Sequence, residues 1–404
     1  MSTPLDTTMS QIQQLLNRQI ERVNQMKLSP PNTPMANLSN ITIGVCPGDG
    51  IGPVIATEAQ RVMQTVLDQL PPPSHRHIQF KPIHGLTIEN RLSLGVAIPP
   101  TVLADLKSCH VILKGPTTTP QVGMGVANIE SANVAMRREL DLFANVRPVQ
   151  IPQLGIDWTF FRENTEGEYV LGSQGIEVNH DISLDFKITT QLGCERIIRA
   201  AFEFAKQTGK KRVSVVTKSN VIKTTDGRFS RVAREIAEEY KADGIQSDEW
   251  YVDIMAAKLI DPARQSDFSV LVMPNLYGDI LTDEAAQLQG GVGTAGSANI
   301  GNRWAMFEAI HGSAPRMVSE GRGDYADPSS MIKAGAMLLR HIGLIDQANQ
   351  IEQALTLCTQ IEKKWIITGR SDGVTASQFA DYILEWAIHP DLDTHYSKGI
   401  AHAS

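Results

Sequence analysis

The chain has 404 residues, 42% of them hydrophobic and 20% charged, a composition typical of a globular protein with room for two or three domains. Its formal net charge of −7 argues against nucleic acid as a partner. The four cysteines form no CxxC pair and match neither a zinc site nor a disulfide framework, so we expect a reducing, cytoplasmic location. The sequence contains no apolar run long enough to span a bilayer and no secretory signal pattern, so we expect no membrane partner.

Residues 1–40 differ from the rest in being rich in Gln, Asn, Ser, Thr and Pro. Apolar residues recur in this extension at helical spacing, at Ile12, Leu15, Leu16, Ile20, Val23 and Met26. The pattern predicts one amphipathic helix, followed by a helix-breaking run at 29–34. We expect the helix to dock on the body of the protein or on a second subunit.

A glycine-rich loop at 47–53 lies between a predicted strand at 41–45 and a predicted helix that starts at Pro53. Its glycines have the spacing GxGxG instead of the GxGxxG of dinucleotide-binding folds, and no acidic residue ends a second strand at the expected distance. We therefore reject a Rossmann site and predict a tight turn, for which the conformational freedom of glycine is suited.

Two predicted strands end next to candidate binding side chains. The strand at 111–113 is followed by three threonines, 117–119, and the strand at 212–216 is followed by Lys218. Because ligands of open α/β sheets bind at the carboxyl ends of strands, both places are candidate binding sites. A plain polar turn is the alternative for the threonines, and Lys218 fits either a base with a lowered pKa or an anion contact.

Three arginines, Arg137, Arg147 and Arg162, lie near small polar side chains. Arginine binds carboxylates through two parallel hydrogen bonds, so the set suits a polycarboxylate, although each arginine alone fits a structural role. Between them and the next motif, alternating residues at 171–190 predict a projecting hairpin, and a helix is expected to begin near Trp250. Helical patterns at 328–341, 345–363 and 377–387 make the C-terminal third helical.

Two aspartates, Asp279 and Asp283, stand four residues apart after an apolar strand-like run at 268–273. In a helix both carboxylates lie on one face, one turn apart, where like charges repel. A divalent cation with oxygen ligands offsets this repulsion. The alternative is an acidic helix start, which the helix dipole tolerates.

In combination these motifs resemble those of the β-decarboxylating dehydrogenases, the isocitrate and 3-isopropylmalate dehydrogenase family. The resemblance covers residue 41 to about 390 and rests on the arginine set and on the segments 48–53, 164–169, 218–220, 278–284 and 311–315. It implies an α/β, two-domain isopropylmalate dehydrogenase-like fold without a Rossmann site. The implied large domain comprises 41–138 and 290–404, and the small domain comprises 139–289 with an intersubunit clasp at 171–190. It also implies a homodimer with shared active sites.

The resemblance assigns a role to each matching residue. Asp279 and Asp283 are similar to ligands of Mg²⁺ or Mn²⁺, completed by Asp253 from a second subunit. Lys218, also from a second subunit, is similar to the lysine that helps remove the hydroxyl proton, and Tyr169 to the donor that protonates the enol after CO₂ is lost. The residues implied to bind the substrate are Ser131, Asn133, Arg137, Arg147 and Arg162.

The substrate prediction depends on the polar residues Ser131 and Asn133. Isocitrate-type members resemble this Ser-x-Asn-x-x-x-Arg pattern, whereas isopropylmalate-type members place apolar residues there. An asparagine buried against an alkyl group would be left unpaired at a cost of about 1–3 kcal/mol. We therefore expect oxidative decarboxylation of isocitrate to 2-oxoglutarate, with 3-isopropylmalate, homoisocitrate or tartrate as alternative substrates.

The nicotinamide cofactor, NAD or NADP, is implied by the resemblance to bind nine residues: Thr118, Asn220, Glu308, His311, Gly312, Ser313, Ala314, Arg316 and Asp327. The clues to its identity conflict. Arg316 stands where NAD-type members carry an aspartate, which favours NADP. Ala376 and Ala380 stand where some NADP-type members carry Tyr and Arg, and on balance we predict NAD. The alternatives of other classes are a non-catalytic regulatory subunit and a plain nucleotide-binding module.

Overall fold

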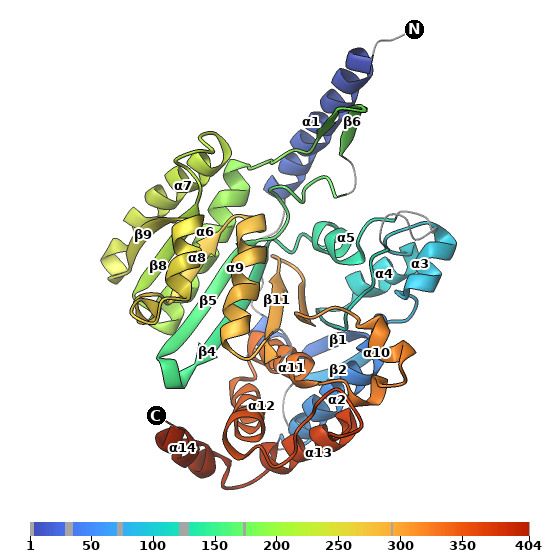
Figure 1. Cartoon of the computed structure of the whole chain (residues 1–404), viewed down its shortest axis with the longest axis vertical. Coiled ribbons are helices and arrows are strands. Elements are labelled where there is room, and N and C mark those ends of the chain that lie inside the picture. The colour runs from blue at the N-terminus through green and yellow to red at the C-terminus, as the bar shows by residue number, and fades with distance from the viewer. Residues whose placement is uncertain are drawn as a thin grey trace. The chain divides into compact units, whose positions relative to one another are not determined.

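The computed structural model describes residues 4–28, 35–70, 76–120, 129–172, 175–291 and 294–403. Its contacts divide the chain into two compact units. Figure 1 labels the helices and strands. Unit 1 comprises residues 1–32, 143–145 and 158–282, and unit 2 comprises 33–142, 146–157 and 283–404. Each unit is thus assembled from segments distant in sequence. The domain limits predicted from the resemblance stay a prediction.

Unit 2 contains a mostly parallel set of strands in the order β2-β1-β3-β12-β11, in which the β11–β12 pair is antiparallel. Strand β3 is buried along its whole length, as expected for a parallel sheet covered on both faces. The strands are β1 (Asn40–Cys46), β2 (His77–Pro82), β3 (Val111–Lys114), β11 (Gly296–Ile300) and β12 (Ala305–Ala309).

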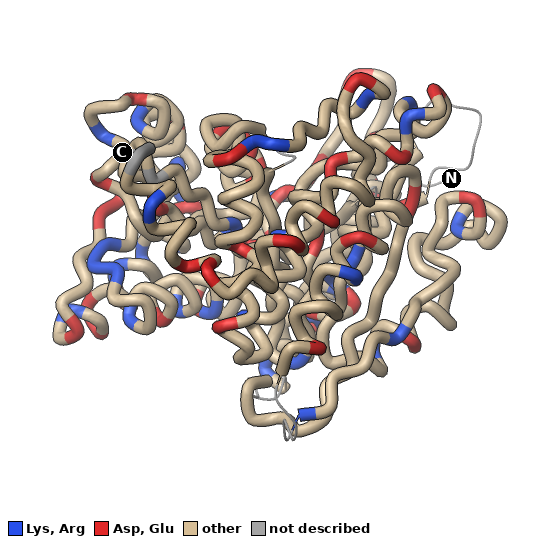
Figure 2. Tube along the Cα trace, turned by 90° about the horizontal axis from the view of Figure 1, so that it is seen from below, with Lys and Arg blue, Asp and Glu red and all other residues tan. Residues whose placement is uncertain are grey.

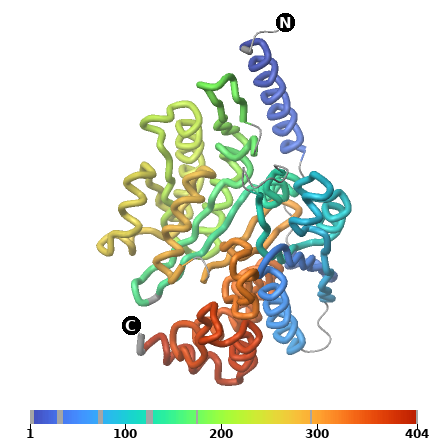
Figure 3. The backbone as a smooth tube through the Cα atoms, turned by 45° about the vertical axis from the view of Figure 1, so that its right-hand side comes forward, coloured from blue at the N-terminus to red at the C-terminus, as the bar shows by residue number. Residues whose placement is uncertain are grey.

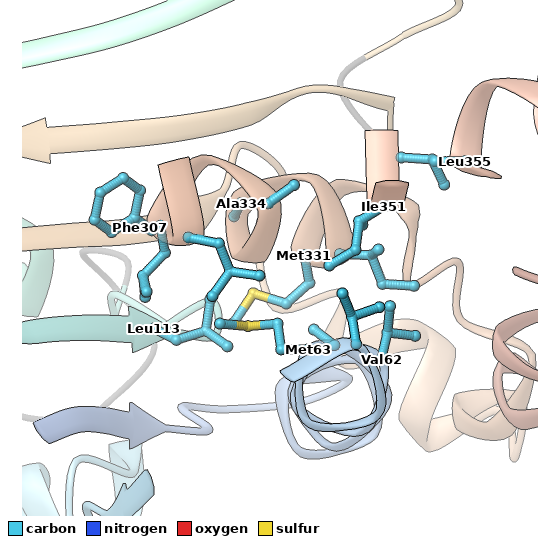
Figure 4. Close-up of a cluster of buried hydrophobic side chains, with 14 of the residues drawn as sticks. Val62, Met63, Leu113, Phe307, Met331, Ala334, Ile351 and Leu355 are labelled. Atoms are coloured by element: carbon cyan, nitrogen blue, oxygen red, sulfur yellow. The ribbon is translucent and has the colours of Figure 1, made fainter. Parts of the chain in front are cut away.

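The core of unit 2 lies between these strands and the helices α2 and α11, where Met63, Leu113, Phe307 and Met331 meet (Figure 4). Helix α13 begins with a capping box formed by Thr375 and Gln378. The helices are α2 (Gly52–Leu67), α3 (Ile88–Leu94), α4 (Pro100–Ser108), α5 (Ala132–Glu139), α10 (Pro315–Ser319), α11 (Ser329–His341), α12 (Ile345–Thr356), α13 (Ala376–Ala387) and α14 (Leu392–Ala403). Short helical turns are η1 (Met35–Asn37), η2 (Pro152–Leu154), η6 (Gly323–Tyr325) and the π-helical η7 (Leu357–Glu362).

Unit 1 contains parallel strands in the order β5-β10-β8-β9. Helix α6 is capped by Thr190, which accepts a hydrogen bond from the Gly193 amide, and ends at Gly209 in the left-handed conformation. The elements are β5 (Ile156–Glu163), α6 (Gln191–Thr208), β8 (Arg212–Thr217), α7 (Thr225–Tyr240), η3 (Lys241–Asp243), β9 (Gln246–Tyr251), α8 (Val252–Leu259), η4 (Gln265–Asp267) and β10 (Val270–Met273). Residues of both units occur in strand β4 (Ala144–Ile151), in strand β5, whose first two residues belong to unit 2, and in helix α9 (Asn275–Leu288).

A long N-terminal helix, α1 (Pro4–Lys27), lies beside a two-stranded hairpin of β6 (Ile176–Asn179) and β7 (Ile182–Leu184) in unit 1 (Figures 1 and 3). The amphipathic helix predicted within residues 1–40 and the hairpin predicted within 171–190 are therefore confirmed. Residues 29–34, predicted to break the helix, lie outside the described part of the chain.

Several features of the secondary structure differ from the prediction. The helix predicted over 345–363 ends at Thr356 and is followed by the π-helical η7, and β4, β5, β12 and α5 were not predicted. The helix expected to begin near Trp250 begins at Val252, because residues 246–251 pair with β8 as strand β9. The bulky aromatic residues there fit the half-buried surface of an edge strand. The last helix, α14, was not predicted. Acidic and basic residues intermingle along the trace (Figure 2). In the described part of the chain, no helix is long and apolar enough to cross a membrane.

Candidate active site

The glycine-rich loop of unit 2 forms a tight turn that packs against two neighbouring loops. Gly48 and Gly50 have φ values of 74° and 60°, and a Cβ atom on Gly50 would lie 1.9 Å from the carbonyl oxygen of Ser313. Between them, the Asp49 carboxylate accepts hydrogen bonds of 2.7 Å from the amides of Ile88 and Thr118. The turn therefore holds the loop after β3 in place, in agreement with the structural reading of these glycines.

Three charged side chains form a cluster where β3 and β12 end: Lys114 and Glu308, which are buried, and the partly buried Arg137 of α5. Lys114 Nζ lies 3.0 Å from Glu308 Oε2, and Arg137 Nη2 lies 3.2 Å from Glu308 Oε1. Asn299 Nδ2 donates a further hydrogen bond of 2.8 Å to Glu308. Burial acts to raise the pKa of Glu308, but the charges of Lys114 and Arg137 outweigh it and leave the pKa at about 2. Glu308 is thus an anion that fixes two cations in place.

A polar cavity of about 110 Å³ opens beside this cluster. Six of the residues predicted to bind substrate or cofactor line it: Asn133, Arg137, Arg147, Glu308, His311 and Gly312. Thr117 Oγ1 donates a hydrogen bond of 2.9 Å to the Asn133 side-chain oxygen. Ser131 directly precedes α5, the helix that carries Asn133 and Arg137. The cavity therefore offers cations and hydroxyl or amide groups.

The other residues predicted to bind the cofactor follow β3 and β12 in unit 2, except Asn220, which lies exposed in unit 1. Thr118 Oγ1 and Ser313 Oγ are 2.7 Å apart, and Ala314 has a left-handed φ of 46°. Asp327 accepts a hydrogen bond from the Ser329 amide, and burial raises the pKa of Asp327. Arg316 is 87% exposed, with its Nε 2.6 Å from Glu320 Oε1.

Unit 1 brings together Arg162, Tyr169 and Asp279. Arg162 forms an ion pair with Asp279 and donates two hydrogen bonds to the Asn275 side-chain oxygen, at 2.9 and 2.7 Å. Tyr169 Oη donates to Asp279 Oδ2 at 2.9 Å. Burial, followed by the adjacent Asp279 carboxylate, raises the pKa of Tyr169 to about 12. Tyr169 therefore keeps its proton at neutral pH, as a proton donor must.

Lys218 and Asp253 form a second pair in unit 1. Lys218 Nζ lies 2.5 Å from Asp253 Oδ1, and hydrogen bonding from Lys218 lowers the pKa of Asp253. The Lys218 backbone amide donates a hydrogen bond of 2.7 Å to Asp226 Oδ2, which fixes the backbone at the end of β8. The lysine is therefore presented from a rigid strand end.

Asp279 and Asp283 are both in helix α9, one turn apart. Asp283 Oδ1 accepts a hydrogen bond of 2.9 Å from Arg147 Nη1, while Asp279 pairs with Arg162. Each carboxylate thus has a cation as partner. Carboxylate oxygens are ligands that Mg²⁺ and Mn²⁺ prefer, so the chemistry of either side chain fits such an ion. Within the described ranges, no group of three His, Cys, Asp or Glu residues could hold a metal ion by itself.

Sequence reasoning did not assign a role to Lys114. The sequence did indicate a special environment, because a lysine at the end of an apolar strand needs a hydrogen-bonding or charged partner once the strand is buried. Its partner, Glu308, is 194 residues away in sequence, so the pairing itself could not be read from spacing.

The family model described as "Isocitrate/isopropylmalate dehydrogenase" matches residues 42–383. Subunit 2 of the mitochondrial NAD isocitrate dehydrogenase of Schizosaccharomyces pombe is 36% identical, with coverage of 78% of this chain and 79% of that protein. The NADP isocitrate dehydrogenase of Rickettsia bellii is 39% identical, and the match covers 79% of this chain but only 63% of that protein. The crystal structure of isocitrate dehydrogenase from Methylococcus capsulatus matches with a TM-score of 0.73 at 35% identity, covering 86% of this chain and 100% of that one. The chain therefore belongs to the isocitrate/isopropylmalate dehydrogenase family, as its motifs predicted.

Proposed function

We propose that the protein catalyses the oxidative decarboxylation of isocitrate to 2-oxoglutarate and CO₂. The observation that carries the proposal is the polar cavity of unit 2, where Thr117 and Asn133 are hydrogen-bonded beside Arg137. An alkyl substituent against these groups would leave polar atoms unpaired, whereas a carboxylate satisfies them. A tricarboxylate thus fits this lining better than isopropylmalate.

The roles of the side chains follow from their chemistry. Arg137, Arg147 and Arg162 bind the carboxylates through charge-assisted hydrogen bonds. Lys218 assists removal of the hydroxyl proton, and the protonated Tyr169 delivers a proton to the enol carbon once CO₂ has left. Asp279 and Asp283 would hold Mg²⁺ or Mn²⁺ with Asp253 of a second subunit. When bound, the ion supplies Lewis acidity, and the nicotinamide supplies a hydride acceptor.

The proposed cofactor preference is NAD over NADP. Arg316 is the cation best placed by sequence to meet a 2′-phosphate, yet its guanidinium is paired with Glu320, which also pairs with Arg322 at 2.6 Å. Ala376 and Ala380 are buried and supply no polar side chain. A carboxylate among the cations disfavours a further phosphate, which supports NAD.

The proposed location is cytoplasmic, and the proposed assembly is a homodimer with shared active sites. All four cysteines lie in the described part of the chain and are free and buried, which supports a reducing compartment. The dimer follows from the assignment of Lys218 and Asp253 to a second subunit's site.

The test is a set of steady-state assays of the purified single chain with Mg²⁺ or Mn²⁺, offering isocitrate and 3-isopropylmalate with each nicotinamide nucleotide. We expect turnover of isocitrate with release of CO₂, and NAD preferred. The variant Asp283→Asn tests the proposed metal ligand. We expect it to lose activity by at least about 100-fold and to bind Mn²⁺ more weakly. Turnover of isopropylmalate alone would reassign the substrate. An inactive single chain that binds nucleotide would favour the regulatory-subunit alternative.

A further inference from the structure

The N-terminal helix α1 lies outside the segment that matches the family model, yet it is built into unit 1. Leu15, 6% exposed, packs in a small apolar cluster with Leu171 and Ile176. Leu171 follows Tyr169 by two residues, and Ile176 begins strand β6. The helix therefore contacts the chain segment that immediately follows the proposed proton donor.

A buried ion pair joins the same helix to the segment that precedes Tyr169. Arg22 Nη2 lies 2.6 Å from Glu166 Oε1, and the two side chains are only 18% and 3% exposed. Arg22 is itself oriented by a hydrogen bond of 3.0 Å from its Nε to the side chain of Gln19, one turn earlier in the helix. At this burial an ion pair is held in one geometry and is little screened by solvent.

Glu166 connects Arg22 of the N-terminal helix to the segment that carries Tyr169. Its carboxylate also accepts hydrogen bonds from the Thr190 amide at 2.8 Å and hydroxyl at 2.5 Å. Its own amide donates to Glu163 at 2.7 Å, and its carbonyl accepts a hydrogen bond of 3.0 Å from the side chain of Asn275. Backbone and side chain of Glu166 are thus both fixed, three residues before Tyr169.

A cation at this position is needed because two acidic groups are buried together. Glu163 and Glu166 are 4% and 2% exposed, and burial, followed by the Glu166 carboxylate, raises the pKa of Glu163. Arg196 approaches the same segment from α6, donating to Thr165 Oγ1 at 2.9 Å. The N-terminal helix supplies a cation here, with Arg22 Nη2 2.6 Å from Glu166 Oε1.

We propose that Arg22 is a positioning residue, which through Glu166 holds the segment 163–172 so that Tyr169 Oη faces the carbon it protonates. The inference rests on the proposed function, because it uses the proton transfer that completes decarboxylation. In that step the C–C bond to CO₂ breaks, its electron pair forms the C=C bond of an enolate, and the keto oxygen takes the negative charge. The enolate carbon then takes the proton of Tyr169 as the C=O bond re-forms, and the tyrosinate regains a proton from water. Arg22 acts only on the placement of the donor and so affects this step more than hydride transfer.

The first experiment measures backbone hydrogen exchange of the segment 163–172 in the full-length protein. We expect Arg22→Gln to raise the exchange rate of this segment at least about fivefold. Arg22→Lys keeps a cation and should recover most of the protection. Lys27→Gln, which removes an exposed positive charge from the same helix, is the matched control and should change nothing there. Unchanged exchange in Arg22→Gln would overturn the proposal, whether or not the enzyme is active.

The second experiment separates the chemical steps, with oxalosuccinate, the β-keto acid of the proposed reaction, as substrate. For Arg22→Gln we expect decarboxylation to slow about tenfold, while reduction of the same acid by the reduced nucleotide falls less than about twofold. Equal losses in both steps would mean a general loss of structure and would contradict a positioning role. A wild-type chain that acts on neither isocitrate nor oxalosuccinate would count against the proposed function instead, with the exchange measurement still deciding the role of Arg22.

Discussion

Two buried glutamates, one in each unit, have pKa values shifted in opposite directions. Glu308 of unit 2 and Glu163 of unit 1 are 5% and 4% exposed. Around Glu308 the charges of Lys114 and Arg137 prevail over burial, and its pKa falls to about 2. Around Glu163, burial and the Glu166 carboxylate act in the same direction and raise the pKa to about 7, although the Thr165 amide and hydroxyl donate to it. At equal burial the sign of the neighbouring charge decides which form is stable.

The largest effect is expected from removing the cation beside Glu308. Lys114→Met would leave a buried carboxylate without its fully buried partner, and we expect a loss of about 3–5 kcal/mol in the free energy of unfolding. Denaturant unfolding measures it. The double variant with Glu308→Gln should recover part of the loss, since the uncompensated charge is then absent. A loss below about 1 kcal/mol would show that the Lys114–Glu308 pair contributes little to stability, and would contradict the contrast drawn between the two glutamates.

The second prediction concerns acid stability. The pKa of Glu308 is lower in the folded protein than the ordinary value of 4.5, so its contribution is fully present above about pH 4.5 and is lost as the pH falls towards 2. The shift corresponds to about 3 kcal/mol. Glu308→Gln should therefore flatten the fall in unfolding free energy between pH 4.5 and pH 2. An unchanged slope in this range would show that other carboxylates carry the acid sensitivity.

Glu163 should show the opposite and smaller dependence. Its pKa is raised in the folded protein, so folding is penalised as the pH rises from about 4.5 through 7, where the unfolded chain has already released the proton. Glu163→Gln should remove this penalty, and the stability of the variant relative to wild type should grow across that interval. The effect should be smaller than for Glu308 because the pair with Glu166 shares it. A variant whose relative stability falls over the same interval would contradict the raised pKa.

The smallest effect on stability is expected at the surface, where a glutamate also lies between two cations. Glu320 is placed between Arg316 and Arg322, and the hydrogen bonds from both lower its pKa. Because exposed ion pairs contribute little, Glu320→Gln should leave the melting temperature within error. The change should instead free Arg316, and we expect kcat/KM for NADP to rise a few-fold relative to NAD. An unchanged ratio of the two values would remove Glu320 from the basis of the cofactor preference.

Local patterns predicted several of the protein's elements, but not β12, α5, β4 or β5, which carry most of the predicted binding residues that line the cavity, and Arg162. Apolar periodicity located α1, β1, β8 and α11, and the glycine spacing correctly excluded a Rossmann turn at 47–53. The start of the helix near Trp250 was misplaced because an aromatic edge strand and a helix start share the same short apolar pattern. The site residues were named from motifs, and their roles remain predictions. The motifs did not reveal which cation each carboxylate pairs with.

The sequence by itself determined the family and the chemical inventory of this protein: the aspartates one helical turn apart, the arginine set and the Lys-Ser-Asn and His-Gly-Ser-Ala-Pro segments. These features are local, so spacing along the chain reveals them. Only the tertiary structure decided which charges meet. Glu308 forms an ion pair with Lys114, 194 residues away in sequence, and Glu166 forms one with Arg22, 144 residues away. The reason is physical: the pKa of a buried carboxylate depends on the charge of its neighbours in space, and folding, not sequence proximity, selects those neighbours.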